Sequence, residues 1–173
     1  MKIMFISDIH GKKTNLQFIK DKYESLGCDQ LVVLGDIYLS GTWDDYDRES
    51  VKDFLESFQN VICMRGNCDS RMDIEEIPFP VEEGYREIHT DTRTLYITHG
   101  NLYNKDTWDI PNSILIYGHT HVPFILEQDN HLFVNPGSIS LPRKNYHPSY
   151  LIFDETSFKI YDIYDTILFQ KSV

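Results

Sequence analysis

Five short apolar runs in this chain each end directly in a polar cluster that carries aspartate, asparagine or histidine. Runs of this length, bounded by turn residues, are typical of buried strands. In α/β proteins the carboxyl ends of such strands form the crevice in which ligands bind. The runs therefore predict a sheet-based fold with one concentrated site. They are Ile3–Ile6 before Asp8 and His10, Leu31–Leu34 before Asp36, Val61–Met64 before Asn67, Leu95–Ile97 before His99, and Ile114–Tyr117 before His119 and His121.

The first half of the chain alternates between predicted strands and amphipathic helices. Apolar residues recur at three- and four-residue steps over 16–26, which predicts a helix, and Gly27 marks its end. Thr14 and Gln17 have the spacing of a capping box at the start of this helix. The apolar residues of 51–58 share one helical face and predict a second helix. This order gives two βαβ units, so the first three strands should be parallel with right-handed crossovers.

The second half is dominated by β signals, because the helical period disappears from about residue 81. Three pairs of short segments flank polar turns and predict hairpins. The pairs are 86–89 with 94–97, 124–126 with 132–134, and 150–153 with 159–163. An α/β first half and a β-rich second half predict an α/β fold of two packed sheets with helices outside. We expect one domain over 1–173, because this length suits a single core.

One polar segment separates the second strand from the second helix. Residues 40–47 are polar, acidic and aromatic, which predicts a loop beside the mouth of the site. Such a loop could bind a partner or gate the site, but an ordinary solvated loop is the favoured interpretation.

Composition restricts the partners and the compartment. The 16 Lys and Arg residues against 27 Asp and Glu residues give a net charge of −11, which opposes binding to nucleic-acid backbones and anionic membranes. No apolar stretch approaches the roughly 18 residues of a membrane span, and the start lacks the regions of a signal peptide, which predicts a cytoplasmic protein. The 3 cysteines form neither a disulfide framework nor a zinc pattern, in keeping with a reducing compartment.

The polar clusters hold enough ligands for two metal ions. Asp8 and His10 are two residues apart, so an extended backbone would point both side chains to one side, and His119 and His121 repeat this spacing. Each residue taken singly is more often a turn or loop residue, but chance does not explain why all of them follow predicted strands. The candidate ligands are Asp8, His10, Asp36, Asn67, His99, His119 and His121. Two carboxylates, one amide and four imidazoles suit Mn, Fe, Co, Ni or Zn better than Ca.

The order of these blocks resembles the signature of the calcineurin-like metallophosphoesterases. The blocks are Asp8-x-His10, Gly35-Asp36, Gly66-Asn67-x-Asp69, His99-Gly100 and Gly118-His119-x-His121. With Gly-Asn-Cys-Asp at 66–69, the chain is similar to the small YfcE-type branch, over roughly residues 1–142 and including Asn-Pro-Gly-Ser at 135–138. The resemblance implies a four-layer double β-sandwich flanked by helices, in agreement with the two packed sheets expected from the residues.

The resemblance also implies how the ligands divide between two ions. One metal would be held by Asp8, His10, Asp36 and His121, and the second by Asp36, Asn67, His99 and His119. Asp36 would bridge them. We expect two divalent cations, with Mn as the first choice and Ni, Co, Fe or Zn as alternatives. The candidate catalytic residues are Asn67, Cys68 and His99.

Two such metals lead to an expected reaction. A pair of dications can clamp a phosphoryl group and lower the pKa of a shared water. We therefore expect hydrolysis of small phosphodiesters by in-line attack of a metal-bound hydroxide, without a phospho-enzyme. The two metals would contribute four positive charges, and Asp8, Asp36 and one hydroxide would contribute three negative ones. The resulting net charge of about +1 would attract a phosphate ester despite the acidic chain.

Cys68 departs from the pattern of the larger phosphoprotein phosphatases. Those enzymes carry at the matching position a histidine that is thought to protonate the leaving group or help to position the phosphate. A thiol with an ordinary pKa of about 8.5 replaces an imidazolium poorly, which favours diesters with good leaving groups. A small, partly buried filler is an equally good interpretation of Cys68.

Two alternatives to the phosphodiesterase stay open. The same metal pair can serve a phosphomonoesterase, and the fold can serve as a non-catalytic scaffold, as in the retromer subunit that resembles this family. Scaffolds of that kind usually lose ligands, whereas all seven candidates are present here, which favours an enzyme. We expect a small phosphate-ester substrate in an open cleft and no membrane partner, and the resemblance allows a homo-oligomer. A nucleic-acid substrate is disfavoured, because no basic and aromatic tract is interleaved.

Overall fold

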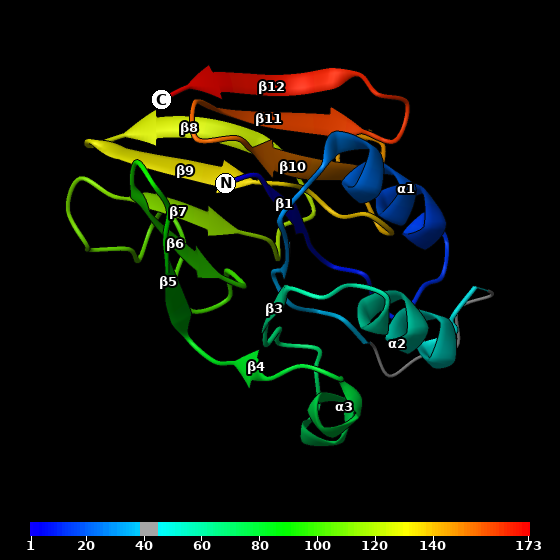
Figure 1. Ribbon diagram of the computed structural model, residues 1–173. Helices are drawn as coiled ribbons and strands as arrows, with labels where there is room; N and C mark the ends of the chain where they lie inside the picture. Colours follow the sequence, from blue (N-terminus) through cyan, green and yellow to red (C-terminus); the bar gives the residue numbers. More distant parts are fainter. Residues whose placement is uncertain (39–44) are drawn as a thin grey trace.

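Two mixed β-sheets packed face to face form the body of the computed structural model, which describes residues 1–38 and 45–173 (Figure 1). Helices flank the larger sheet, so the expected fold of two packed sheets with helices outside is confirmed. The predicted loop over 40–47 falls largely on residues 40–44, which lie outside the described residues. At its described end, Tyr46 pairs with Lys12 through an isolated antiparallel bridge.

The larger sheet has seven strands and is centred on the first three predicted ones. In spatial order the strands are β12 (Ile167–Ser172), β11 (Ser157–Asp162), β10 (Ser149–Phe153), β1 (Ile3–Ile6), β2 (Gln30–Val33), β3 (Val61–Met64) and β4 (Val81–Glu82). β1, β2 and β3 are parallel, with Ile3 opposite Gln30 and Leu31 opposite Val61, as two βαβ units require. β10, β11 and β12 extend the sheet with antiparallel pairing.

The smaller sheet has five strands. In spatial order they are β5 (Tyr85–His89), β6 (Thr94–Thr98), β7 (Ile114–Tyr117), β9 (His131–Asn135) and β8 (Phe124–Gln128). The three predicted hairpins are confirmed as the antiparallel pairs β5–β6, β8–β9 and β10–β11. β6 and β7 are parallel, so their carboxyl ends lie at the same edge of this sheet.

The helices α1 (Leu16–Leu26) and α2 (Arg48–Glu56) cover the outer face of the larger sheet. α1 ends at Gly27, whose φ of 62° gives the expected left-handed end. Its start differs from the expectation, because the Thr14 hydroxyl donates to Asp45 Oδ2 at 2.5 Å. Asn15 becomes the N-cap, and its side chain makes no capping hydrogen bond to the helix. The capping box expected at Thr14 is therefore wrong.

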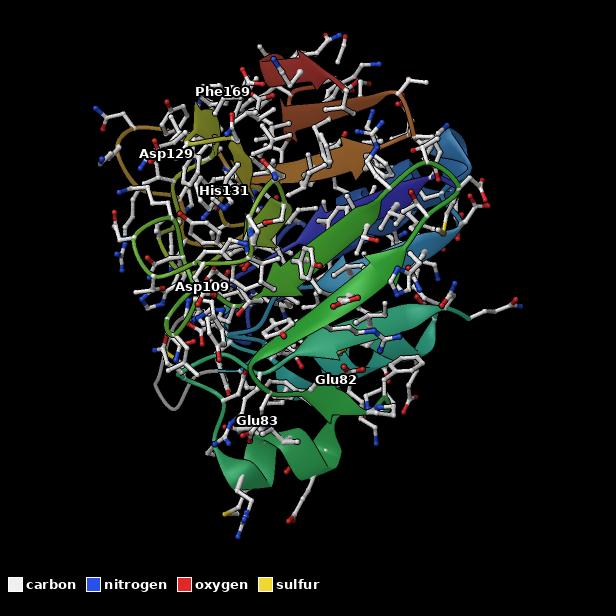
Figure 2. The ribbon with its side chains drawn as sticks, turned by 90° about the vertical axis from the view of Figure 1, so that its left-hand side faces the viewer. Glu82, Glu83, Asp109, Asp129, His131 and Phe169 are labelled. Carbon is white, nitrogen blue, oxygen red and sulfur yellow. The ribbon has the colours of Figure 1, made fainter. Side chains whose placement is uncertain are left out.

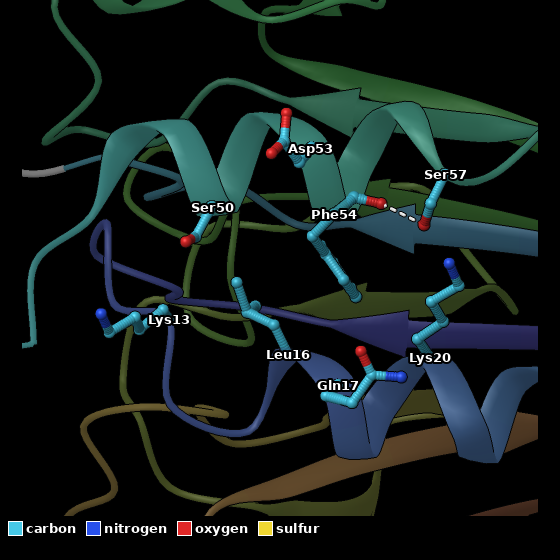
Figure 3. A pocket seen from close by; sticks show the side chains of 8 residues that line it. All are labelled: Lys13, Leu16, Gln17, Lys20, Ser50, Asp53, Phe54 and Ser57. Carbon is cyan, nitrogen blue, oxygen red and sulfur yellow. Dashed lines mark hydrogen bonds between the residues drawn. The ribbon is translucent and has the colours of Figure 1, made fainter.

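A third helix, α3 (Arg71–Glu76), follows β3. It begins with a capping box between Ser70 and Asp73, a pattern present in the sequence but not used to predict it. α1 and α2 leave a shallow groove between them, in which Leu16 and Phe54 supply the apolar surface (Figure 3). Within the described ranges, no helix combines the length and the apolar character needed to cross a membrane.

Alternation along the strands divides the core into two layers. Ile3 and Phe5 of β1 point between the two sheets, whereas Met4 and Ile6 point toward α1 and α2, and all four are fully buried. A shift of β1 by one residue would exchange both sets, so the register of this strand fixes the position of the polar residues that follow it.

The outer face of the smaller sheet is covered by the segment that joins β6 to β7. Trp108 of this segment belongs to one buried cluster with Tyr117 and Phe133, and its indole Nε1 donates to Ser113 Oγ at 2.8 Å. Figure 2 looks onto this side of the molecule, where Asp109 marks the covering segment. The segment therefore covers β7 on the outer face of the sheet, just ahead of the polar cluster that follows this strand.

Glu155 joins the two sheets at the end opposite to the polar clusters. Its carboxylate, in the β10–β11 turn, accepts hydrogen bonds from the Thr90 and Thr92 hydroxyls of the β5–β6 turn at 2.9 and 2.6 Å. Burial raises the pKa of Glu155, but the hydrogen bonds from Thr92 and Thr90 outweigh it and hold the pKa at about 2. The folded state therefore stabilises the charged form of the Glu155 carboxylate.

We expect Glu155→Gln to lower the melting temperature by about 3 °C at pH 7, because charge-assisted hydrogen bonds between the sheets are lost. A depressed pKa stabilises the fold above the ordinary value of 4.5, and this contribution fades as the pH falls toward about 2. The difference from the wild type should therefore be smaller at pH 3 than at pH 7 in thermal unfolding. Glu127→Gln, at an exposed carboxylate, is the matched control, and an equal difference at both pH values would contradict the assignment.

Candidate metal centre

All five polar clusters lie at one end of the two sheets. Those after β1, β2 and β3 come from the larger sheet, and those after β6 and β7 come from the smaller one. Because the sheets pack face to face, the ends of their parallel strands open toward one place. The structure brings all seven candidate ligands together there. Five of them are at most 5% exposed, namely Asp8, His10, Asp36, His99 and His121.

Five candidate ligands adopt a left-handed backbone conformation. Their φ values are 56° at Asp8, 52° at His10, 51° at Asp36, 64° at His119 and 60° at His121. This conformation is uncommon outside glycine and persists where the surrounding structure holds it. Here Asp8 N donates to Gly35 O at 3.1 Å, and His10 N donates to Asp36 O at 2.9 Å. The extended backbone expected at both two-residue spacings is therefore wrong, and the side chains converge because the chain turns.

The first group of candidate ligands is formed by Asp8, His10 and His121, whose ligand atoms lie within 4.8 Å of one another. His121 Nε2 lies 3.3 Å from Asp8 Oδ1 and 3.3 Å from His10 Nε2. Asp8 Oδ2 accepts from His119 N at 3.0 Å, whereas Oδ1 is buried and has no hydrogen-bond partner in the described part of the chain. An unpartnered buried carboxylate oxygen beside two imidazole nitrogens fits a cation.

The second group is formed by Asp36, His99 and His119. His99 Nε2 lies 3.4 Å from Asp36 Oδ2 and 3.1 Å from Asn67 Oδ1. On the other side of the ring, His99 Nδ1 donates to Leu34 O at 2.7 Å, which leaves Nε2 facing two oxygens. If a cation were bound among these three atoms, Nε2 would lose its proton and all three could offer their lone pairs to it.

His121 is oriented in the same way as His99. Its Nδ1 donates to Leu141 O at 2.7 Å, so its Nε2 faces Asp8 and His10. A backbone carbonyl behind a histidine ring fixes the tautomer and the ring orientation of a metal ligand. The ends of β6 and β7, both in the smaller sheet, thus each supply one histidine whose Nε2 is already directed into the site.

Asp36 lies between the two groups. Its Oδ2 is 3.8 Å from His10 Nε2 and 3.4 Å from His99 Nε2, and its Oδ1 accepts from Cys68 N at 2.8 Å. Burial raises the pKa of Asp36, but the hydrogen bond and charge of His99 outweigh it and lower the pKa to about 2. The carboxylate is therefore charged at neutral pH and has one oxygen available to both groups.

The charges at the site also act on its histidines and its thiol. Burial lowers the pKa of His10, whereas the pKa of His99 is raised, because Asp36 and Asp8 outweigh the effect of burial on its ring. Burial, together with the charge of Asp36, raises the pKa of Cys68 to about 12. The half-buried Cys68 thiol is therefore protonated at neutral pH and is a weak acid in this environment.

Asp69 connects the two loops that carry Asp36 and Asn67. Its carboxylate accepts three backbone N–H groups, from Ile37 and Tyr38 at 2.9 Å and from Gly66 at 2.8 Å. Burial raises the pKa of Asp69 to about 6, despite these hydrogen bonds. Asp69 thus joins the loop after β2 to the loop after β3, and so places Asp36 beside Asn67.

A cleft of about 1020 Å³ opens over the site. His10, Asp36, Asn67 and Cys68 lie along it, whereas Asp8 and His99 are not among its lining residues. Its other wall was not predicted from the sequence. That wall consists of Lys105, Tyr117, Thr120, Val122, Phe124, Leu141, Pro142, Arg143 and Lys144. The adjacent apolar and basic residues of 141–144, directly after the Asn-Pro-Gly-Ser block, are the signal that could have indicated it.

Gly66 is required by the close approach of the loops after β2 and β3. A Cβ at this position would lie 2.1 Å from both the backbone N and the Oδ1 of Asp36. We expect Gly66→Ala to displace Asp36 and to weaken Mn²⁺ binding at least about tenfold in calorimetry. Gly27→Ala is the control, since its Cβ would meet nothing within 4 Å and only its left-handed backbone would be strained. Equal Mn²⁺ affinity in the Gly66→Ala variant and the wild type would contradict the role of Gly66.

Comparison with known proteins identifies relatives of this chain. Residues 1–157 match the calcineurin-like phosphoesterase superfamily domain. The chain is 35% identical over 164 residues to the phosphodiesterase YfcE of Escherichia coli K12, covering 89% of this chain and 88% of that protein. The solved structure of E. coli YfcE, a phosphoesterase, matches with a TM-score of 0.93 at 30% identity and covers 100% of both chains.

A more distant likeness shows the fold alone. The structure of vacuolar protein sorting 29 from Cryptosporidium parvum matches with a TM-score of 0.67 at 20% identity, covering 99% of this chain and 98% of that one. The family match over most of the chain and the similarity to YfcE lead to one conclusion: the chain belongs to the calcineurin-like phosphoesterase superfamily and is a homologue of YfcE.

Proposed function

We propose that the chain is a metal-dependent phosphodiesterase that hydrolyses small phosphodiesters. The observation that carries this proposal is the position of Asp36 Oδ2, 3.8 Å from His10 Nε2 and 3.4 Å from His99 Nε2. A carboxylate between two sets of imidazoles can bind two cations at once, as two-metal phosphoester hydrolysis needs. The 35% identical YfcE is named a phosphodiesterase, which supports the same reaction here.

The proposal divides the ligands between two cations. Asp8, His10, Asp36 and His121 would hold one, and Asp36, Asn67, His99 and His119 would hold the other. When bound, the two dications supply charge that stabilises the phosphoryl group and lowers the pKa of a water. Mn²⁺ is our first choice, with Ni, Co, Fe or Zn as alternatives, because the set mixes imidazole nitrogens with oxygens.

The protein's own residues position the reactants. The carbonyls of Leu34 and Leu141 keep His99 and His121 in one orientation, and Asp69 fixes the two loops that carry Asp36 and Asn67. None of these hydrogen bonds has to form during the reaction, which lowers the reorganisation that the transition state requires. We propose that hydrolysis proceeds by in-line attack of water without a covalent enzyme intermediate.

The preference for diesters follows from the weak acid at position 68. Cys68 lines the cleft, and its pKa of about 12 makes it a weaker proton donor to a departing alkoxide than an imidazolium. Esters whose alcohols leave without a proton should therefore react best.

Metal dependence and ester preference can be tested together. We expect metal-stripped protein to be inactive and added Mn²⁺ to restore hydrolysis of bis(4-nitrophenyl) phosphate, with slower hydrolysis of 4-nitrophenyl phosphate. Asp36→Asn should lower the restored activity at least about a hundredfold, because the shared charge is lost while asparagine still accepts the left-handed backbone. Release of 4-nitrophenolate measures both reactions.

The opposite results are equally informative. Faster cleavage of the monoester would favour a phosphomonoesterase. If neither ester is cleaved with Mn, Ni, Co, Zn or Fe although calorimetry shows that the metal binds, the proposal is wrong and a scaffold of the same fold becomes the better interpretation.

Replacement of Cys68 tests the role of this position. We expect Cys68→His to raise the hydrolysis of methyl phenyl phosphate, a diester with a poor leaving group, by about tenfold, because an imidazolium is a stronger acid than this thiol. Hydrolysis of bis(4-nitrophenyl) phosphate should change less. Cys63→Ser, at a fully buried cysteine, controls for loss of a thiol as such. An unchanged rate for methyl phenyl phosphate in Cys68→His would remove Cys68 from the mechanism and leave it as a filler.

A further inference from the structure

The cleft has a second wall that the proposed metal centre does not use. This wall combines apolar side chains with three basic ones, whereas the rest of the lining is made of candidate ligands and Cys68. Val122, Phe124, Leu141 and Pro142 are only partly buried, although each lies next to a strongly polar site. Apolar surface left accessible inside a cleft is typical of a region that binds part of a ligand.

The basic part of this wall is held against the metal centre. Arg143 N donates to His121 O at 3.1 Å, and Leu141 O accepts from His121 Nδ1 at 2.7 Å. Leu141 N in turn donates to Ser138 Oγ at 2.8 Å, and this hydroxyl donates to Asp8 O at 2.8 Å. The backbone that carries Arg143 is therefore fixed relative to two candidate ligands.

Arg143 and Lys144 are free to bind an anion. Over residues 1–38 and 45–173, neither side chain has an acidic partner, although the chain carries 27 Asp and Glu residues. Lys105, the other cation of the cleft, pairs with Asp106 Oδ1 at 2.6 Å. Arginine offers a fork of donors that matches the oxygens of a phosphate or carboxylate.

We propose that this wall binds the ester arm of the substrate that does not leave, and that Arg143, assisted by Lys144, binds a second anionic group on that arm. The inference rests on the proposed phosphodiesterase function and deepens it. The substrate class is a small phosphodiester whose retained arm carries an aromatic or apolar ring and, beyond it, a phosphate or carboxylate. The ring packs against Val122, Phe124, Leu141 and Pro142, and the scissile phosphate lies at the candidate ligands.

Two chromogenic diesters with the same leaving group test the role of Arg143. Thymidine 5′-(4-nitrophenyl phosphate) and its 3′-phosphorylated form differ only in the remote phosphate. In the Mn²⁺-loaded wild type we expect kcat/KM to be about fivefold higher for the phosphorylated form, mainly through a lower KM, the size expected for an exposed charge pair. In Arg143→Gln this ratio should fall to about 1, and Arg143→Lys should restore part of it.

Lys52→Gln is the matched control. It removes one positive charge from α2, where Lys52 pairs with Glu56 at 3.8 Å outside the cleft. The ratio of the two kcat/KM values should stay as in the wild type. If Lys52→Gln and Arg143→Gln lower the ratio equally, only the net charge matters and the assignment to Arg143 is overturned.

A second pair of substrates tests the apolar part of the wall. Phenyl 4-nitrophenyl phosphate and methyl 4-nitrophenyl phosphate share a leaving group and differ in the retained arm. The kcat/KM value of each ester is divided by the rate constant of its uncatalysed hydrolysis in alkaline solution. Because the ring is buried, this corrected value should be about tenfold higher for the phenyl ester than for the methyl ester. Equal corrected values for the two esters would overturn the assignment of the ring to this wall.

Binding measurements separate this inference from the proposed function. Calorimetry with thymidine 3′,5′-bisphosphate and thymidine 5′-monophosphate needs no turnover. We expect the wild type to bind the bisphosphate about fivefold more tightly than the monophosphate. The Arg143→Gln variant should bind both nucleotides with the same affinity. If no diester is cleaved but this difference is found, the proposed function fails and the anion site stands. If diesters are cleaved but both nucleotides bind alike, the anion site fails alone.

Discussion

Two buried carboxylates held close to the same histidine form the constraint on which the rest of this structure depends. Asp8 Oδ1 and Asp36 Oδ2 lie 3.9 and 3.8 Å from His10 Nε2, and the two aspartates are 0% and 2% exposed. Burial disfavours each charge, and the charges repel one another. Two backbone hydrogen bonds offset part of this unfavourable free energy, because His119 N donates to Asp8 Oδ2 and Cys68 N donates to Asp36 Oδ1. The remaining oxygens, Asp8 Oδ1 and Asp36 Oδ2, are the ones that a cation would satisfy.

The two sheets supply the rigidity that such a site needs. β1 is paired on both sides, with β2 and β10, and its alternating side chains fill both layers of the core, so Asp8 and His10 leave a strand that cannot slip without exposing apolar surface. The smaller sheet delivers His99 and His119 from the ends of β6 and β7. Since each group combines ligands from both sheets, the face-to-face packing of the sheets sets the distances within each group.

Local sequence patterns predicted the features that depend on local chemistry. Apolar runs and turn residues gave the strands that carry the candidate ligands, and the three hairpins and two longer helices followed from periodicity. Features that depend on distant partners could not be obtained in this way. Thr14 has the spacing of a cap, but its hydroxyl bonds Asp45, a residue 31 positions away. Asp69 lies two residues after a candidate ligand, yet it binds the backbone of a loop that begins more than thirty positions earlier. The wall around Arg143 also could not be predicted from local patterns, because only the tertiary contact with His121 places Arg143 in the cleft.

The left-handed backbone at five candidate ligands also restricts how the site can change in evolution. Outside glycine, this conformation is best tolerated by aspartate, asparagine and histidine, which are also residues that can bind metals. The codons of these three amino acids differ from one another only in the first base. A single nucleotide exchange can therefore replace an oxygen ligand by a nitrogen ligand, or a charged ligand by a neutral one, without imposing a new backbone conformation. The loops thus form a scaffold on which metal selectivity can drift while the fold stays the same.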